Sequence, residues 1–560
     1  MPDAVTSVRE LADRFVTTMC DQDPPAATFL GLDGAHDKLA DLSQEADQRF
    51  AARYADLARR ATDIDPVTLP PTDAITRAMV IQQADTRIRT EEARMVEYSI
   101  TDFFVAPASV LLTIMPMLAP ATPELAEAYL SRLAGVPRYL SQAAERHRQG
   151  VAAGRTPVAH LVEAATKHID RYLADPEHDP LAVPAPGAGP ADFAGRRDEL
   201  LADVVHPAFA RYRDVLTAEI LPHGRPADRP GLKWLPDGDV LYRNLVRSHT
   251  TTTRTPDELH QTGLDIIARL RDEYAELGGR ALGTSDLAEI FRRLRFDEDL
   301  RWRTAEELLD GARQAIGRAE AVAPQWFNLR PEQSCEVRPV PEAAAPGAAA
   351  AYYMPPSMDG SRPGVYFANT YQVTERFRHQ CEATAFHEAV PGHHFQMALS
   401  LGLTDLPMLR RIADVNAYGE GWGLYSERLA DEMGLYSDDI ARLGMLTADS
   451  MRAGRLVVDT GLHAKGCSRQ QAVDVLSEHT PMAAVEIEAE TDRYIAYPGQ
   501  ALSYMVGRLE IQRIRAQAEA TLGDAFDIRG FHDVVLGNGQ LPMPVLAEVV
   551  DTWVASRAGG

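Results

Sequence analysis

Cysteine is scarce in this chain, with four residues in 560: Cys20, Cys335, Cys381 and Cys467. These cysteines form no C-x-x-C pair and follow no regular spacing, which excludes a disulfide framework and a cysteine-based metal site. A reducing compartment suits this usage. Residues 1–5 also lack the basic start and apolar run of a signal peptide, so the sequence predicts a cytoplasmic protein.

Positive charge is also in short supply. The chain has 57 lysine and arginine residues against 81 aspartate and glutamate residues, a net charge of -24. Nucleic acids and anionic membranes both favour basic surfaces, so neither is an expected partner. Only four of the basic residues are lysine, which together with abundant alanine indicates a coding bias rather than a function. The charge is compatible with a monomer or a homodimer.

Long hydrophobic runs are missing, with residues 103–120 as the nearest approach to one. Pro107 and Pro116 interrupt this run, and no charge asymmetry flanks it. Both features are typical of buried core or of a cleft wall rather than of a membrane span.

Helical periodicity, in contrast, is abundant. Ser7-Val8-Arg9-Glu10 is a capping box followed by apolar residues at helical spacing, and Thr255-Pro256-Asp257-Glu258 repeats this signature. Strand-like alternation is rare. The sequence predicts a mostly α, multi-helix fold. We divide it into an N-terminal helical region (1–245), a helical connecting region (246–334) and a catalytic region (335–560), all expected to be intertwined; the family resemblance given below implies a deep cleft that the N-terminal region helps to form.

One stretch departs from the helical pattern. Ala351-Tyr352-Tyr353 and Val365-Tyr366-Phe367 are short β-favouring runs separated by turn-like residues at 358–360 and 362–364. They predict a small β-hairpin or sheet just before the histidine motif described next. Such an edge could bind a peptide by strand addition, or it could only cap the helical domain. Asn369, at the end of this stretch, is a candidate substrate-binding residue.

His387 and Glu388 open the most informative stretch, because His393 and His394 follow six and seven positions after His387. Neutral imidazoles bind a catalytic zinc ion, and a neighbouring glutamate takes a proton from the water that the ion activates. The stretch therefore predicts a zinc site.

The spacing of these histidines is irregular. In the common H-E-x-x-H pattern the two ligands lie four apart on one helix face. Six steps leave His393 about 120° off the face of His387, unless Pro391 and Gly392 disturb the turn between them. His394 would share that face on a regular helix. We favour His393 as the second ligand, in which case His394 lies behind the site. The alternative is that His394 is the second ligand.

A catalytic zinc ion usually has three protein ligands and one open position. Glu420 and Glu427 follow after one helix-loop interval and share a helix face, and three glycines around Glu420 let another backbone come close. We predict that Glu420 is the third ligand and that Glu427 lies behind the ligands. The alternative is that both glutamates lie on a solvated face.

Further polar residues follow along the next helical stretch. Asp459 precedes His463 by one turn and could orient its imidazole, which would donate to a developing oxyanion. The alternative is a salt bridge between Asp459 and Arg455 within the helix.

The residues around Tyr497-Pro498-Gly499 complete the candidate site. Tyr494 or Tyr504 could stabilise an oxyanion. Arginine can hold a substrate carboxylate through two hydrogen bonds. The candidate substrate-binding residues here are Arg493, Gln500 and Arg508.

Three motifs together resemble the DUF885 proteins: His-Glu-Ala-Val-Pro-Gly-His-His from His387, Glu-Gly-Trp-Gly-Leu-Tyr from Glu420, and Arg-Tyr-x-x-x-Pro-Gly-Gln-Ala-x-x-Tyr from Arg493. Thr-Pro-Asp-Glu-Leu-His at 255–260 extends the resemblance over nearly the whole chain. It implies a helical, cleft-containing fold similar to zinc peptidases of the oligopeptidase and carboxypeptidase Taq type. In that fold His387, His393 and Glu420 would hold the zinc, and Glu388 would be the general base.

The sequence thus predicts a metallohydrolase with one Zn²⁺ per chain, or another divalent metal, that cleaves amide bonds of short peptides. One alternative is a specialised amide hydrolase for a single biosynthetic or catabolic intermediate. Another is a metal-free helical protein that binds peptides, although the intact Glu388 argues against it. A lyase or isomerase could use the same ligands.

Overall fold

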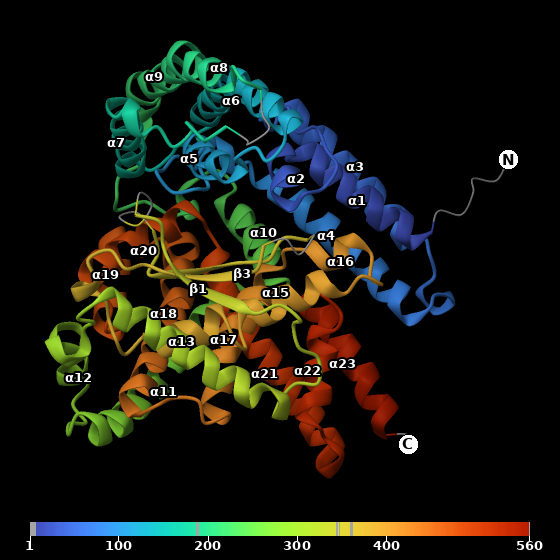
Figure 1. The fold of residues 1–560 in the computed structure, drawn as a ribbon, viewed down its shortest axis with the longest axis vertical. Coiled ribbons are helices and arrows are strands. Elements are labelled where there is room, and N and C mark those ends of the chain that lie inside the picture. Colours follow the sequence, from blue (N-terminus) through green and yellow to red (C-terminus); the bar gives the residue numbers. More distant parts are fainter. Residues whose placement is uncertain (1–6, 186–189, 343–344, 346–347, 359–361, 559–560) are drawn as a thin grey trace.

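The structure is a computed structural model that describes residues 7–185, 190–342, 345, 348–358 and 362–558. It is mostly α-helical, as predicted (Figure 1). The helices of the N-terminal part are α1 (Val8–Gln22), α2 (Pro24–Leu30), α3 (Gln44–Thr62), α4 (Pro71–Ala93), α5 (Pro107–Ile114), α6 (Pro123–Ala152), α7 (Ala159–Ala174), α8 (Phe193–Leu200) and α9 (His206–Val215).

The remaining helices follow in two groups. The helices that lie in sequence between the N-terminal part and the first strand are α10 (Gly238–Thr250), α11 (Pro256–Ala281), α12 (Leu287–Phe296) and α13 (Ala305–Val322). Those after the sheet are α14 (Cys381–Glu388), α15 (His393–Gly402), α16 (Met408–Ile412), α17 (Asn416–Glu432), α18 (Asp439–Thr460), α19 (Arg469–His479), α20 (Ala484–Ala496), α21 (Ser503–Leu522), α22 (Ile528–Leu536) and α23 (Met543–Ala558).

Both predicted capping boxes are confirmed. The Ser7 side chain accepts from the backbone of Glu10 at the start of α1, and the Glu10 carboxylate accepts from the Ser7 backbone. Thr255 and Glu258 make the same reciprocal contacts at the start of α11. Each pair satisfies two backbone donors that a helix start leaves unpaired, which is why these helices begin where they do.

The predicted β element is a three-stranded sheet with the order β1-β3-β2. Strand β2 (Ala351–Met354) pairs antiparallel with β3 (Gly364–Ala368), which confirms the two β-favouring runs. Strand β1 (Cys335–Pro339) pairs parallel with β3 and was not predicted. Of the turn-like residues at 358–360, positions 359 and 360 lie outside the described residues.

The apolar run at 103–120 forms α5 and a short 3-10 turn. Leu111 and Met115 are buried, whereas Phe104 and Met117 are partly exposed. The expected interior position is therefore confirmed for part of the run. In the described part of the chain, no helix combines the length and apolarity that crossing a bilayer requires.

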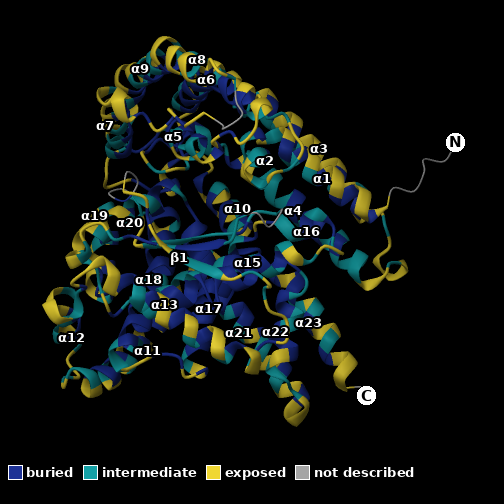
Figure 2. Cartoon of the chain, viewed as in Figure 1, coloured by how far each residue is buried: buried dark blue, intermediate teal, exposed yellow. Residues whose placement is uncertain are grey.

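The largest hydrophobic cluster unites side chains from both the 246–334 and the 335–560 regions, together with a few from α4 and its surroundings. A second cluster belongs to the N-terminal helices. The division into three regions stays a prediction. Figure 2 shows that buried residues concentrate around the sheet and α17, inside a shell of helices with exposed outer faces.

Helix α17 lies against α21 at two glycines. A Cβ added to Gly421 would lie 2.5 Å from the Cα of Gly507, and a Cβ added to Gly507 would lie 1.8 Å from the carbonyl oxygen of Ala417. Only glycine fits both positions without moving a backbone. The prediction that glycines beside Glu420 let another backbone come close is confirmed.

Candidate metal centre

The histidine motif is built on two helices with a break between them. Helix α14 ends at Glu388 and α15 begins at His393. A Cβ on Gly392 would lie 1.9 Å from the carbonyl oxygen of His387, so the chain can turn here only with glycine. The predicted disturbance by Pro391 and Gly392 is confirmed.

Helix α17 satisfies a backbone group that this break exposes. The indole N–H of Trp422 donates to the carbonyl oxygen of Pro391 over 2.8 Å, and the Ser426 hydroxyl donates to the same oxygen over 3.3 Å. A buried carbonyl without a partner is costly, so these contacts stabilise the break. They also fix the break relative to the helix that carries Glu420.

His387 is oriented by Glu427. Its Nδ1 lies 2.8 Å from the Glu427 Oε1, and both side chains are buried. A carboxylate only accepts, so Nδ1–H donates and the lone pair of a neutral imidazole lies on Nε2. This carboxylate-histidine pairing is the usual arrangement behind a metal-binding imidazole. Glu427 therefore lies where the sequence predicts it.

Glu420 faces both histidines. Its Oε2 lies 3.7 Å from Nε2 of His387 and 3.4 Å from Nε2 of His393. These separations exceed an ordinary N–H···O hydrogen bond, which spans about 2.7–3.2 Å. Ligands held about 2.0–2.1 Å from a tetrahedral zinc ion lie roughly 3.3–3.4 Å from one another. The two separations are close to the edge of a zinc coordination tetrahedron, and the one from His393 matches it.

Glu388 lies close to the same point. One ligand atom each from His387, Glu388 and His393 lies within 4.8 Å of the others. Two carboxylates, Glu388 and Glu420, thus compete for the third position. Glu420 is the stronger candidate because a single oxygen faces both imidazoles, whereas Glu388 lies beside them.

His394 is excluded as the second ligand because both of its ring nitrogens have other partners. Nδ1 lies 2.9 Å from the hydroxyl of Tyr353 on β2, and Nε2 lies 3.0 Å from the carbonyl oxygen of Gln333. The carbonyl requires a donor, so Nε2 carries the proton and Nδ1 accepts from the tyrosine. The geometry favours His393, whose Nε2 lies 3.4 Å from the Glu420 Oε2.

The charges of the cluster oppose its burial. Burial lowers the pKa of His387, but the carboxylates of Glu420 and Glu427 outweigh this effect and raise it to about 9. Burial likewise raises the pKa of Glu420, but the two imidazoles outweigh it and hold the pKa well below its usual value. The donor set is thus poised to exchange a proton for a metal ion, as metal binding requires.

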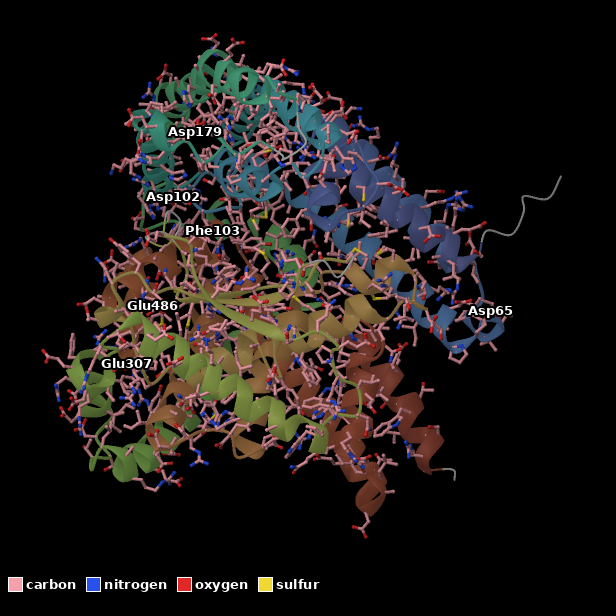
Figure 3. All side chains as sticks on the ribbon, in the orientation of Figure 1. Asp65, Asp102, Phe103, Asp179, Glu307 and Glu486 are labelled. Atoms are coloured by element: carbon pink, nitrogen blue, oxygen red, sulfur yellow. The ribbon has the colours of Figure 1, made fainter. Side chains whose placement is uncertain are left out.

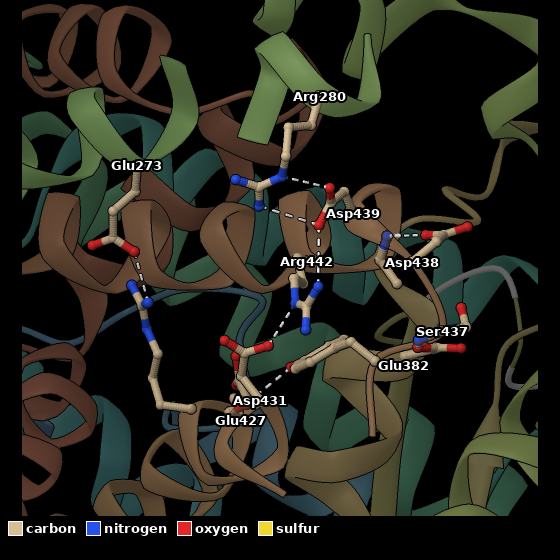
Figure 4. Close-up of polar contacts among 12 residues, drawn as sticks. Glu273, Arg280, Glu382, Glu427, Asp431, Ser437, Asp438, Asp439 and Arg442 are labelled. Atoms are coloured by element: carbon tan, nitrogen blue, oxygen red, sulfur yellow. Dashed lines mark hydrogen bonds and ion pairs between the residues drawn. The ribbon is translucent and has the colours of Figure 1, made fainter. Parts of the chain in front are cut away.

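An ion-pair network fixes α17 from its far side. Arg442 on α18 binds Asp431 over 2.7 Å and Asp439 over 3.1 Å, and Arg280 on α11 binds Asp439 over 2.8 Å (Figure 4). The hydroxyl of Tyr436 donates to the backbone carbonyl of Glu427 over 3.1 Å. These contacts hold the helix that carries both glutamates.

Tyr504 is the predicted tyrosine nearest to the histidines. Its ring centroid lies 6.3 Å from that of His387, with the two rings nearly parallel. Tyr494 is buried, and its hydroxyl accepts from Nε of Arg455 over 2.9 Å. Between the two, only Tyr504 lies against a proposed metal ligand.

The expected pairing of Asp459 with His463 is wrong. Asp459 accepts from the Tyr242 hydroxyl over 2.5 Å and from the Gly499 backbone over 3.1 Å. His463 accepts from the Leu232 backbone at Nδ1 and donates from Nε2 to the Tyr494 carbonyl. Both of its nitrogens serve the backbone, so the imidazole cannot donate to an oxyanion.

Competing partners explain this error. Helix α18 ends at Thr460, and the following segment Gly461–Lys465, which carries His463, is π-helical. The Tyr242 hydroxyl and the Gly499 backbone occupy the Asp459 carboxylate, and backbone groups of Leu232 and Tyr494 occupy both nitrogens of His463. The alternative salt bridge is also absent from the described contacts of Asp459, because Arg455 pairs with Glu490 over 2.9 Å.

Two predicted substrate-binding residues have structural roles instead. The Asn369 amide donates to the carbonyls of Ala345 and Ala348 and accepts from the Tyr371 backbone, which fixes the chain around β3. Arg508 is buried and forms a close ion pair with Asp449. The described contacts of both side chains are thus with the protein itself.

Arg493 and Gln500 contact each other. Nη2 of Arg493 donates to Oε1 of Gln500 over 2.8 Å, and Nη1 lies 3.2 Å from Oε1 of Glu490. Both side chains lie on the same side of the molecule as Tyr504, to which the Arg455 guanidinium binds through its ring face at 4.5 Å. These residues form a polar group next to the metal-binding cluster.

A pocket of about 600 Å³ adjoins the cluster on another side, with walls from α2, β2, α15 and α16. Its described lining includes Tyr353, Met397 and Asp414. Asp414 is exposed at the wall of this pocket, and its charge interacts with that of Glu420. Sequence reasoning missed Asp414, because it precedes α17 and shares no helical spacing with Glu420.

Comparisons with known proteins agree with the motifs. The family described as "Bacterial protein of unknown function (DUF885)" matches residues 24–550. The structure is similar to that of a "putative lipoprotein" from Colwellia psychrerythraea, with 29% identity, a TM-score of 0.90, and coverage of 98% of this chain and 100% of that one.

A second solved structure shares the fold. It is a "putative lipoprotein of unknown function" from Shewanella oneidensis, with 16% identity, a TM-score of 0.75, and coverage of 97% of this chain and 99% of that one. No curated protein matches the chain. The family match spans most of the sequence, and it includes all three motifs around the proposed metal ligands. The chain is a member of the DUF885 family.

Proposed function

We propose that this protein is a zinc-dependent hydrolase that cleaves amide bonds in short peptides. The observation that carries the proposal is the position of the Glu420 Oε2, 3.4 Å and 3.7 Å from the Nε2 atoms of His393 and His387. Three donor atoms at this spacing, with His387 fixed from behind by Glu427, suit a catalytic zinc ion.

When bound, zinc would supply a Lewis acid and lower the pKa of a coordinated water to about 7. Glu388 would accept the proton of the attacking water and later deliver it to the leaving nitrogen. Its place next to His387, and within 4.8 Å of the ligand atoms, supports this role. Tyr504 would donate a hydrogen bond to the developing oxyanion.

Metal content tests the ligand assignment. We expect about one zinc ion per chain in the purified protein, its loss in His387→Ala and Glu420→Ala, and its retention in His178→Ala. His178 is exposed and distant in the fold, so it controls for the loss of a histidine. Zinc retained by Glu420→Ala would show that this ligand is misassigned, and no zinc in any form would favour a metal-free peptide-binding protein.

Turnover tests the general base. Glu388→Gln keeps the shape of the side chain but cannot accept a proton, so it should bind zinc normally and lose most hydrolysis of a panel of di- and tripeptides. Hydrolysis of acylated amino acids but not of peptides would instead indicate the specialised amide hydrolase. A cytoplasmic location and a monomeric or dimeric state are proposed with this function.

A further inference from the structure

Next to the proposed metal centre lies a cluster of arginines around Tyr504. The guanidinium carbon of Arg455 lies 4.5 Å from the Tyr504 ring centroid, and that of Arg452 lies 5.7 Å from it. Both arginines come from α18, and Tyr504 comes from α21. Since the same ring lies 6.3 Å from the ring of His387, one aromatic side chain separates the arginines from the histidine.

These arginines have more hydrogen-bond donors than the protein uses. The Arg455 Nη1 and the Arg452 Nε are buried and have no hydrogen-bond partner. Arg455 is 3% exposed and Arg452 is 16% exposed. Buried donors without a partner are rare in proteins, and each one calls for an explanation.

The acidic neighbours do not saturate the cluster. Glu490 lies between Arg455 and Arg493 and accepts from both. Glu427 is 3.9 Å from Arg452, too far for a hydrogen bond, and it is already bound to His387. Glu486 also lies near these arginines, but no described acidic side chain accepts from the Arg452 Nε or the Arg455 Nη1, so these two buried donors are left for a ligand.

An apolar wall adjoins this charge. The Arg493 guanidinium carbon lies 5.8 Å from the ring centroid of Phe103. The ring of Phe104 follows at 4.2 Å from that of Phe103, and Phe104 is 48% exposed. Figure 3 labels Phe103 where the N-terminal helices approach the C-terminal half, with Glu486 of α20 below it.

We propose that Arg452 and Arg455 bind the free C-terminal carboxylate of a peptide whose last side chain is apolar and contacts Phe103 and Phe104. The protein would then remove one or two residues from the C-terminus. The inference rests on the proposed hydrolase function for the cleavage, although the carboxylate site stands on its own geometry.

The dimensions agree with this assignment. One residue of extended chain spans roughly 3.3–3.6 Å. The Tyr504 ring lies 6.3 Å from the His387 ring and 4.5 Å from the Arg455 guanidinium carbon, so a carboxylate on Arg455 lies within the reach of a few residues from the histidine. In the reaction the amide C–N bond breaks, a C–O bond forms from water, and the leaving nitrogen gains a proton.

The test compares acetyl-Ala-Ala-Phe with its C-terminal amide. Guanidinium-carboxylate hydrogen bonds are among the strong ones, so we expect the free acid to be hydrolysed with a kcat/KM on the order of 10- to 100-fold higher. Free phenylalanine or Ala-Phe should be the product. Equal hydrolysis of acid and amide would overturn the carboxylate site and leave the hydrolase function standing.

Variants locate the effect. Arg452→Gln and Arg455→Gln should remove most of the preference for the acid, whereas Arg455→Lys should keep part of it. Arg303→Gln is the matched control, because Arg303 is exposed and lies just before the start of α13, in a different part of the sequence. Arg455 also supports Tyr494, so thermal unfolding must be compared. Arg452 donates to the Ala448 carbonyl of its own helix over 3.4 Å, and the thermal unfolding of its variant is compared in the same way. An unchanged preference in folded Arg452→Gln and Arg455→Gln would refute the assignment.

A binding measurement separates this inference from the proposed function. If neither peptide is hydrolysed, binding is measured instead by calorimetric titration of both peptides into the protein and into the two glutamine variants. This measurement decides whether the carboxylate site exists. Tighter binding of the acid than of the amide, lost in the variants, would support the carboxylate site although the hydrolase proposal had failed. Equal binding, or none, would overturn the site as well.

Discussion

Gly423→Ala should weaken metal binding without unfolding the protein. Gly423 lies on α17 against the edge of the His387 ring. A Cβ at this position would lie 2.7 Å from Cε1 and 2.8 Å from Nε2 of that ring. Carbon contacts settle at about 3.5–4.0 Å, so the imidazole or the helix must move by roughly 0.8 Å.

That displacement is large for a metal site. Ligand distances in working sites hold to within about 0.2 Å, and disturbing the groups behind a ligand typically costs 10- to 100-fold in metal affinity. We therefore expect a loss of about 1.4–2.8 kcal/mol in zinc binding. Alanine is a better helix former than glycine by about 0.5–1 kcal/mol, which offsets part of the steric cost to folding.

The assay is competition for zinc between the metal-free protein and a chromogenic chelator. Gly317→Ala is the matched control, because it is also a helical glycine but has no atom within 4 Å of an added Cβ. It should bind zinc like the parent protein and unfold at a slightly higher temperature. Parent-like zinc affinity in Gly423→Ala would refute the assignment of His387 as a ligand in this orientation.

Three further predictions address the surroundings of the site. Glu427→Gln removes the carboxylate that accepts from His387 and should lower zinc affinity by about 10- to 100-fold in the same competition, whereas unchanged affinity would mean that this contact does not orient the ligand. Gly507→Ala places a Cβ 1.8 Å from the Ala417 carbonyl oxygen and should lower the free energy of unfolding by about 1–3 kcal/mol or more in a denaturant titration. Gly279→Ala, whose added Cβ has no atom within 4 Å, should not lower it. Equal stability of the two variants would exclude a tight helix contact at Gly507. Burial, with the charge of Glu490, raises the pKa of Glu486 to about 7, so Glu486 gains negative charge near Arg452 and Arg455 as the pH rises through about 7. Binding of the peptide with a free C-terminal carboxylate should therefore weaken over that pH range in the parent protein and not in Glu486→Gln. Identical pH profiles of the two proteins would argue against this coupling.

Local sequence signals predicted much of the fold. The capping boxes at Ser7 and Thr255 fix helix starts through contacts only three residues apart, so their outcome does not depend on the rest of the chain. The β2–β3 pair was visible as two β-favouring runs. Strand β1 was not, because its parallel pairing with β3 depends on a crossover that no short pattern encodes.

At the candidate site, too, local patterns were predicted and contacts between distant segments were missed. The ligand residues lie in compact motifs whose chemistry is specific, and their predicted neighbours Glu427 and Tyr504 lie close to His387. The contact between Asp459 and His463 was predicted wrongly because both side chains bind partners from distant segments, Tyr242 and Gly499 for the aspartate and Leu232 and Tyr494 for the histidine. Arg508 failed because its partner, Asp449, lies on another helix, and sequence spacing carries no information about such a pair.

The break between α14 and α15 has a consequence for when the protein could bind the proposed metal. A single helix with both histidines could hold an ion as soon as it formed. Here the two imidazoles are separated by a joint whose Pro391 carbonyl is held by Trp422 and Ser426 of α17. Helix α17 in turn lies in contact with α21 at Gly421 and Gly507. We expect a growing chain to lack the complete donor set until α21 has been synthesised and has docked, so that unfinished copies do not capture the ion.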